Sequence, residues 1–217
     1  MLNSFLLVVF IFGILALILL SKHEMLTLGY NAISRAKPAQ LDLNSFVRNG
    51  PNEKDSKRSY IFSEVPIVSM AHKFKGRFDH AILSWDTGPI LEYIIEKKYP
   101  ANYLPERASP EDIFQASLYA LALKEKGVSV TSTQLVIIYC LQDLASTCPG
   151  AHRISQCSRC RGGRVFKSRF NEKATQRKLK QLDEVWYKQR KPRPNPSQEN
   201  CRICSFGKNG ICPFSAV

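Results

Sequence analysis

Hydrophobic residues occupy most of the first twenty positions of the chain. The run FLLVVFIFGILALILL lies within residues 1–20, and the first charged residue is Lys22. About twenty helical residues span roughly 30 Å, the thickness of the hydrocarbon core of a bilayer. A cleaved signal peptide would carry a basic N-terminal region and a small-x-small cleavage site, and neither is present. We therefore expect residues 1–21 to form an uncleaved transmembrane anchor.

The residues that follow this run indicate its orientation. Lys22, Arg35 and Lys37 all lie on its C-terminal side, and positively charged flanks favour the cytoplasm. We therefore expect a single-pass protein of the inner (plasma) membrane, with its C-terminal body in the cytoplasm. Because that compartment is reducing, the seven cysteines are interpreted as thiols or metal ligands rather than as disulfides.

Beyond the anchor the pattern changes twice. Residues 22–58 are weakly periodic and end in a polar stretch, which is typical of a linker with one helix. Three runs rich in β-branched and aromatic residues then predict successive strands over residues 60–70, 72–85 and 89–99. The sequence Asp86-Thr87-Gly88-Pro89 separates the second run from the third and predicts a hairpin loop.

The clearest helix signal follows these strands. Ser109 is a suitable N-cap, Pro110 fits the first helical position, and Gly127 suits the end of the helix. An apolar strand is predicted next, over residues 133–140, so the chain must cross over with its helix packed on the sheet. A second helix is predicted over residues 172–188. The expected organisation is an anchor (1–21), a linker (22–58), an α/β (α+β) domain (59–145) and a basic, Cys-rich region (146–217).

The net charge of the chain indicates what kind of partner it binds. The chain has 31 Lys and Arg against 18 Asp and Glu, a formal net charge of +13, all of it beyond the apolar run. An excess of this size favours a polyanion, either nucleic acid or an anionic membrane surface. Basic residues dominate between Arg153 and Arg193 and are interleaved with aromatic ones: Phe166, Phe170, Trp186 and Tyr187. This mixture suits phosphate contact and base stacking, but a solvated helix face near an anionic leaflet explains it equally well.

Acidic residues of the predicted hairpin carry the candidate chemistry. If the loop is centred between Thr87 and Gly88, Asp79 lies directly across from Glu96, with Cβ atoms about 4.5–5.5 Å apart. Strand alternation then places Lys98 on the same face as Glu96. Two carboxylates beside an amine suit Mg²⁺, which proteins usually hold through one or two carboxylates, waters and substrate phosphate oxygens. The lysine can stabilise charge on the phosphate or orient the attacking water.

Three motifs in this order resemble a known family. They are Gly76-Arg-Phe-Asp79, then Glu96-Lys97-Lys98, then Gln115-Ala-Ser-Leu-Tyr119 on the predicted helix. The series resembles the PD-(D/E)XK nuclease superfamily, and most of all its RecB-like exonucleases, including the CRISPR-associated ones. The resemblance implies a restriction-endonuclease-like mixed β-sheet flanked by helices. It implies that Asp79 and Glu96 bind Mg²⁺ or Mn²⁺, that Lys98 is catalytic, and that Gln115 and Tyr119 lie beside the site.

We therefore expect a membrane-anchored, metal-dependent nuclease that hydrolyses phosphodiester bonds, of DNA rather than RNA. One alternative is a non-catalytic nucleic-acid-binding protein that keeps the nuclease fold. Another is a membrane-bound scaffold whose charge serves only the lipid. The first expectation requires metal-dependent turnover, which neither alternative shows.

Some assignments at the site stay open. Glu92 shares a face with Glu96 and is the alternative metal ligand, although no lysine follows it two residues on. Gln115 and Tyr119 are also consistent with a buried hydrogen-bonded pair that has no function. The family often has a further ligand before the Asp, and the only nearby candidates in this sequence are Glu53, Glu64 and His72.

The cysteines suggest a second metal. Cys157–Cys160 and Cys201–Cys204 are C-x₂-C pairs, a spacing that lets two thiolates bind one ion. Cys201, Cys204 and Cys212 also resemble the C-terminal cluster ligands of the RecB-like family, which implies a [4Fe-4S] cluster. Its fourth ligand would be Cys148, Cys157 or Cys160; the other possibility is Zn²⁺ held by the two pairs.

Overall fold

The computed structural model describes most of the chain beyond the apolar run: residues 10, 12–14, 33–51, 58–148, 154–157, 162–191, 194 and 196–217, with only the backbone of residue 199. The predicted anchor, residues 1–21, lies almost entirely outside these ranges. Within them, no helix is both long and apolar enough to cross a bilayer. The chain divides into two compact units, Met1–Thr175 and Gln176–Val217, and each is described by itself.

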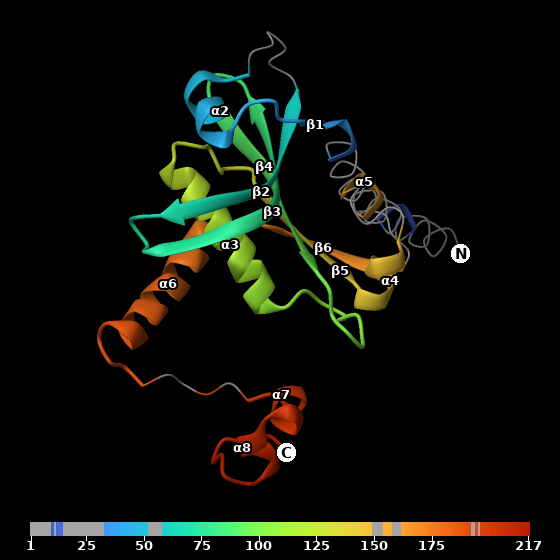
Figure 1. Cartoon of the computed structure of the whole chain (residues 1–217), viewed down its shortest axis with the longest axis vertical. Coiled ribbons are helices and arrows are strands. Elements are labelled where there is room, and N and C mark those ends of the chain that lie inside the picture. The colour runs from blue at the N-terminus through green and yellow to red at the C-terminus, as the bar shows by residue number, and fades with distance from the viewer. Residues whose placement is uncertain are drawn as a thin grey trace. The chain divides into compact units, whose positions relative to one another are not determined.

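The first unit is built on a mixed β-sheet (Figure 1). Among the described residues it has six strands in the spatial order β1-β2-β3-β4-β5-β6. Their bounds are Lys37–Pro38, Ser59–Ser69, Phe74–Trp85, Pro89–Lys98, Gln134–Cys140 and Gly163–Arg169. The β1–β2 and β4–β5 pairs are parallel, and the other neighbours are antiparallel. The predicted mixed α/β fold is therefore confirmed, and β6 is a strand that the sequence pattern did not predict.

The β3–β4 hairpin differs from its prediction near the loop. Trp85 pairs with Pro89, so the loop is centred on Thr87 and not between Thr87 and Gly88. The register then shifts at a bulge between Ile82 and Leu83, where Glu92 of β4 has no partner in the β3–β4 ladder. Beyond the bulge the predicted register holds. The two departures cancel before the strands reach the acidic residues.

The long helix α3 (Pro110–Glu125) forms the predicted crossover between β4 and β5. The Ser109 hydroxyl accepts a hydrogen bond from the Asp112 N–H (3.0 Å), as expected of an N-cap. Gly127 follows the helix with φ of +94°, which glycine adopts without strain. Ala116, Ala120 and Leu123 are fully buried where α3 packs on the sheet.

A shorter helix covers one end of the same unit. Helix α2 (Leu43–Asn49) is capped by Asp42, whose carboxylate accepts hydrogen bonds from two N–H groups of the first turn. Its Phe46 is buried against three aromatic rings: those of Tyr60, Phe62 and Trp85. Part of the 22–58 segment, which the sequence indicated as a linker, therefore packs on the sheet.

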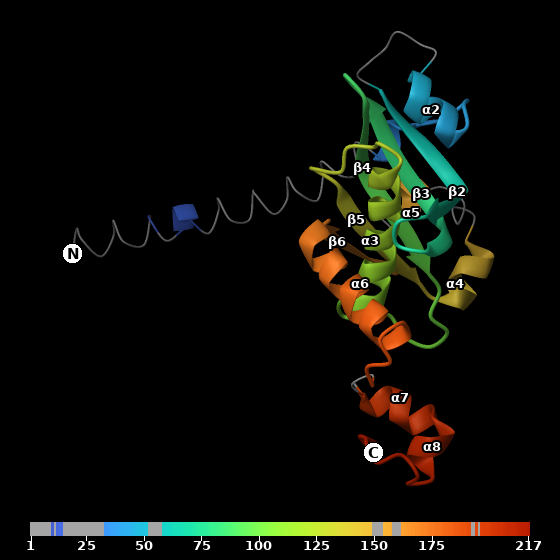
Figure 2. The same cartoon turned by 90° about the vertical axis from the view of Figure 1, so that its left-hand side faces the viewer.

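The opposite face of the sheet is also covered. Figures 1 and 2 show α3 and the short helix α5 (Ile154–Cys157) on opposite sides of the strands. Ile33 and Ile154 pack there against four buried side chains of the sheet: Ile82, Ile95, Val136 and Ile138. Helix α4 (Gln142–Thr147) lies between β5 and α5 in the chain. The central strands β3, β4 and β5 are thus covered on both faces.

The second unit is small and helical. It comprises most of the predicted helix α6 (Glu172–Trp186), then α7 (Gln198–Ile203) and α8 (Ser205–Lys208). Cys201 is buried, and its sulfur accepts a hydrogen bond from the Ala216 N–H (3.4 Å), whereas Cys204 is exposed.

The predicted C-terminal metal-binding segment is not found in the described part of the chain. There, no three His, Cys, Asp or Glu side chains are placed to hold one metal ion. One reason is that Cys201 of α7 is buried, whereas Cys204, which follows the helix, is exposed to solvent. Cys157 belongs to the other unit, and Cys160 lies outside the described residues.

Candidate active site

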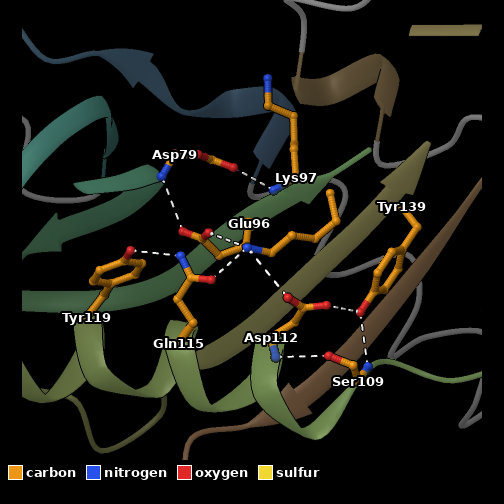
Figure 3. Close-up of polar contacts among 9 residues, drawn as sticks. Asp79, Glu96, Lys97, Ser109, Asp112, Gln115, Tyr119 and Tyr139 are labelled. Atoms are coloured by element: carbon orange, nitrogen blue, oxygen red, sulfur yellow. Dashed lines mark hydrogen bonds and ion pairs between the residues drawn. The ribbon is translucent and has the colours of Figure 1, made fainter. Parts of the chain in front are cut away.

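Asp79 and Glu96 meet where β3 and β4 separate (Figure 3). The ladder between these strands begins at the pair His80–Ile95, and beyond it the two carboxylates accept hydrogen bonds from backbone groups across the gap. Lys97 N–H donates to Asp79 Oδ2 (2.6 Å), and Asp79 N–H donates to Glu96 Oε1 (3.3 Å). The two predicted acids therefore lie together where the β3–β4 ladder ends.

Glu96 is unusually placed for an acid. Its side chain is only 2% exposed. Burial, followed by the charge of Asp79, raises the pKa of Glu96 to about 7, although Lys98 acts in the opposite direction. Because Asp79 and Glu96 repel each other, the protein alone does not fully neutralise the negative charge of the two carboxylates. A divalent cation between them would remove that imbalance.

Lys98 lies beside Glu96, as predicted. Its ammonium donates to Gln115 Oε1 (2.7 Å) and to Glu96 Oε2 (3.4 Å). It also forms an ion pair with Asp112 Oδ1 (3.6 Å), and its side chain is 23% exposed. The amine thus stands among three oxygen acceptors that come from β4 and α3.

Gln115 and Tyr119 form the hydrogen-bonded pair expected from their spacing on α3. Gln115 Nε2 donates to the Tyr119 hydroxyl (2.9 Å), while the amide oxygen of Gln115 binds Lys98. The Tyr119 ring packs edge-on against Phe78. It also lies so close to Gly76 that a Cβ atom there would be 2.6 Å from the ring. The glycine of the Gly76–Asp79 motif therefore makes room for the tyrosine.

Two further hydrogen bonds beside this site were not predicted as site contacts, and they link Asp112 to Tyr139 and Tyr139 to Ser109. The Tyr139 hydroxyl donates to Asp112 Oδ2 and accepts a hydrogen bond from the Ser109 N–H (3.0 Å). The sequence pattern indicated Ser109 only as a helix cap. A signal was present, since Asp112 precedes Gln115 by three positions and so shares its helix face.

The other candidate residues lie elsewhere. Glu92, the alternative ligand, is the unpaired residue of the bulge and accepts a hydrogen bond from the Ser59 hydroxyl (3.0 Å). Glu64 is exposed on β2, the His72 N–H donates to the Ser69 hydroxyl, and Glu53 lies outside the described residues. Lys97 contributes its backbone only: Figure 3 shows its side chain pointing away from Glu96.

Asp79 and Glu96 suit Mg²⁺ or Mn²⁺, which bind carboxylate oxygens and often take only one or two of them from the protein. Across the described ranges no third acidic, histidine or cysteine side chain completes a ligand group with them. The remaining coordination would therefore come from water and from the substrate. No protein-family model and no curated protein matches the chain.

Proposed function

We propose that this protein is a membrane-anchored, metal-dependent nuclease of the PD-(D/E)XK superfamily, in its RecB-like branch, and that it hydrolyses phosphodiester bonds of DNA. One observation carries the proposal: Asp79, Glu96 and Lys98 converge with Gln115 in a single hydrogen-bonded network. Residues 1–21 would hold the enzyme at the inner membrane, with its body in the cytoplasm.

Each residue has a distinct task in this proposal. Mg²⁺ or Mn²⁺ held by Asp79 and Glu96 would supply Lewis-acid polarisation of the phosphate and a more acidic water. Lys98 would donate hydrogen bonds to a phosphate oxygen or orient the attacking water. Gln115 restrains Lys98, and Tyr119 restrains Gln115, so the amine keeps its place beside Glu96. Preformed geometry of this kind lowers the barrier because little rearrangement is needed during the reaction.

Charge supports a polyanionic substrate. The net charge of +13 favours phosphate contacts. Arg177 and Lys180 are exposed on α6, and Trp186 and Tyr187 near its end offer exposed rings for base stacking. We assign these side chains to substrate binding rather than to chemistry.

The cysteines carry a separate proposal, which rests on their spacing and on the resemblance to the RecB-like family. A [4Fe-4S] cluster would be bound by Cys201, Cys204 and Cys212, completed by Cys148, Cys157 or Cys160; alternatively, Zn²⁺ would be held by the two C-x₂-C pairs. Absorbance and metal analysis of anaerobically purified protein test it. Protein without iron or zinc would reject it.

The nuclease activity is tested with the full chain in detergent, a labelled DNA oligonucleotide, and Mn²⁺ or EDTA. D79N and K98A should each lower cleavage by about 10²-fold or more, while oligonucleotide binding stays close to that of the wild type. D86N is the matched control, because it removes an exposed carboxylate from the hairpin loop of the same sheet. Wild-type cleavage by both D79N and K98A would refute the proposal.

The non-catalytic alternative is favoured by one observation, the burial of Glu96 with a pKa of about 7, which lets the protein hold this carboxyl partly neutral without an ion. It predicts salt-sensitive DNA binding by the wild type and no turnover with Mg²⁺ or Mn²⁺. The same assay therefore separates the two functions.

A further inference from the structure

We infer that Asp112 is a positioning residue for the nuclease reaction, and that its carboxylate holds Lys98 in place when Glu96 is engaged by the metal ion. The inference rests on the proposed function. It begins from the ion pair between Asp112 Oδ1 and Lys98 Nζ, at 3.6 Å, with the Asp112 side chain 21% exposed.

Asp112 is itself fixed from two elements. Its own N–H donates to the Ser109 hydroxyl at the start of α3, and Tyr139 of β5 donates a hydrogen bond to its second oxygen. The Tyr139 hydroxyl is in turn held by the Ser109 N–H. Tyr139 is buried and its ring packs edge-on against Phe166, so this hydroxyl cannot swing away easily. One carboxylate oxygen is thereby anchored, and the other is directed at the lysine.

Helix capping alone does not explain this arrangement. An acidic residue in the first turn of a helix is favourable because of the helix dipole. Glu111 already satisfies that preference in the same turn of α3, and it is exposed to solvent. The contacts to Tyr139 and Lys98 distinguish Asp112 from its neighbour.

The charges around Lys98 suggest the purpose of the contact. When ionised, Asp79, Glu96 and Asp112 together carry three negative charges, and Lys98 carries one positive charge. Two negative charges are left unbalanced, and one divalent cation would neutralise them. If Glu96 held a metal ion, Lys98 would lose its nearest counter-charge. Asp112 and the Gln115 oxygen would then remain as the partners of Lys98 and would keep the amine at the site. Without Asp112, Lys98 would be drawn toward Glu96 and would compete with the ion.

The test compares D112N with E111Q, which removes one charge from the same helical turn without touching Lys98. We expect D112N to lower kcat by about 10–100-fold, the usual cost of losing a residue that orients a metal site, with KM for the oligonucleotide changed by less than about threefold. D112E should recover part of the activity. Y139F should lower kcat in the same direction but less, because Asp112 keeps its charge and is released from only one restraint.

A second measurement reports on Lys98 directly. Acetylation by a limiting amine-reactive reagent, followed by peptide mass spectrometry, should modify Lys98 several-fold faster in D112N than in the wild type. The rate at the exposed Lys75 should not change. E111Q should match the wild type in both experiments. If D112N keeps the wild-type kcat and the wild-type Lys98 labelling rate, the inference is overturned.

The two hypotheses fail differently. A wild-type protein that does not cleave DNA removes the proposed function, yet the labelling experiment still decides whether Asp112 restrains Lys98. A wild type that cleaves, with a D112N variant whose kcat falls only in proportion to its folded fraction, leaves the nuclease standing and reduces Asp112 to a structural residue.

Discussion

Two buried ionisable side chains, Glu96 and His80, have pKa values shifted in opposite directions. Burial is the main cause in both, because each side chain is stabilised in its neutral form. The pKa of Glu96 is raised to about 7. The pKa of His80 is lowered to about 4, with a further contribution from the charge of Lys97. Nδ1 of His80 forms a hydrogen bond with the Ser63 hydroxyl, while its Nε2 is buried and has no hydrogen-bond partner among the residues that the structure describes.

Glu96 should make the metal-free protein less stable as pH rises. Its pKa in the folded state is about 7 against an ordinary value of 4.5, so the folded state holds the proton more tightly. Its contribution is therefore complete below pH 4.5 and disappears as pH rises through 7. E96Q should remove this decline and exceed the wild type at pH 8 by on the order of 1–3 kcal/mol. Urea unfolding in EDTA at pH 5 and pH 8 measures the difference.

His80 should change the stability with pH in the opposite direction to Glu96, so it can be compared with Glu96 in the same protein. Its pKa is lower in the folded state than its ordinary value of 6.5, so stability falls as pH drops from 6.5 toward 4. The two effects oppose each other between pH 4.5 and 6.5. E96Q should therefore keep the fall on the acid side while the fall toward pH 8 disappears. Identical pH profiles for E96Q and the wild type would contradict the assignment.

Which site residues the sequence could predict depends on how local their contacts are. Gln115 and Tyr119 lie on one helix, and helical spacing was enough to bring them together. Asp79 and Glu96 lie on one hairpin, and their predicted register holds because the bulge at Glu92 compensates for a loop that is centred on Thr87. Helical spacing places Asp112 on the same face as Gln115, but its contact with Tyr139 could not be predicted, because that contact exists only once α3 packs beside β5. Non-local contacts of this kind leave no periodic trace in the chain.

At the scale of elements, the end of the β2–β3 hairpin turns toward α3. Phe78 packs on Tyr119 of α3, whereas Ile82, which has the same alternation along β3, belongs to the cluster on the opposite face. The strands must therefore twist between these residues. At that point Glu64 of β2, which lies across from Asp79 in register, has φ of +54°. A non-glycine residue in this conformation is uncommon and marks local strain beside the candidate site.

Gly76 lies near the end of the β2–β3 hairpin and contacts Tyr119 of the candidate site. The substitution G76A tests whether this position requires glycine. The new Cβ would lie 2.6 Å from the Tyr119 ring, which is held by Phe78 and Gln115 and cannot move freely. We expect a decrease of about 1–3 kcal/mol in unfolding free energy, typical of overpacking. Cleavage should also fall at temperatures where the protein stays folded. Urea unfolding and the DNA assay measure the two effects.

G88A is the control for G76A. Gly88 lies in the hairpin loop, and nothing is within 4 Å of a Cβ atom placed there. The substitution should change stability by less than about 1 kcal/mol. If G76A were equally harmless, the close approach of Tyr119 would not constrain this position.

The elements were predictable to different degrees. The strands β2 to β5 and the helix α3 have strong periodic signals and clear ends, and the structure places them within a few residues of their predicted bounds. Strand β6 was interpreted only as basic sequence, because Arg, Lys and Ser interrupt its apolar alternation. It pairs with β5 at the edge of the sheet, so backbone hydrogen bonds hold it in the sheet although its side chains do not alternate regularly between apolar and polar.

At the scale of the whole molecule, the basic excess should make DNA binding steeply dependent on salt. Binding to single strands should weaken with NaCl with a log–log slope of about −0.7 for each phosphate that the protein neutralises. The double substitution R177Q/K180Q on α6 should make the slope less negative by about 0.7 for each phosphate that is no longer neutralised. Fluorescence anisotropy between low and physiological salt measures both quantities.

A second double substitution separates local binding from net charge. R48Q/K37Q removes two charges from α2 and β1, far along the chain from the basic, aromatic-rich segment. It should leave the slope close to that of the wild type. Equal effects of the two double substitutions would indicate that only the total charge matters and that α6 is not a binding surface for DNA.

Some whole-chain expectations remain predictions. The anchor at residues 1–21 rests on hydropathy, and the metal at the cysteines rests on C-x₂-C spacing. Sequence spacing cannot decide the latter, because Cys157 and Cys201 are separated by a long stretch of chain and belong to different compact units.

The bulge at Glu92 also allows the β4 strand of the hairpin to lose one residue without changing the register at the acids. Between the pair Ile82–Tyr93 and the loop, β4 has one residue more than β3. Deletion of a single residue from the β4 part of this interval, Ile90–Glu92, can be absorbed by regularising the ladder, and the acids keep their alignment. Insertion of a residue must enlarge the turn instead. Natural variation should therefore tolerate small deletions there more readily than the same deletions between Asp79 and Ile82, where every following side chain would change faces.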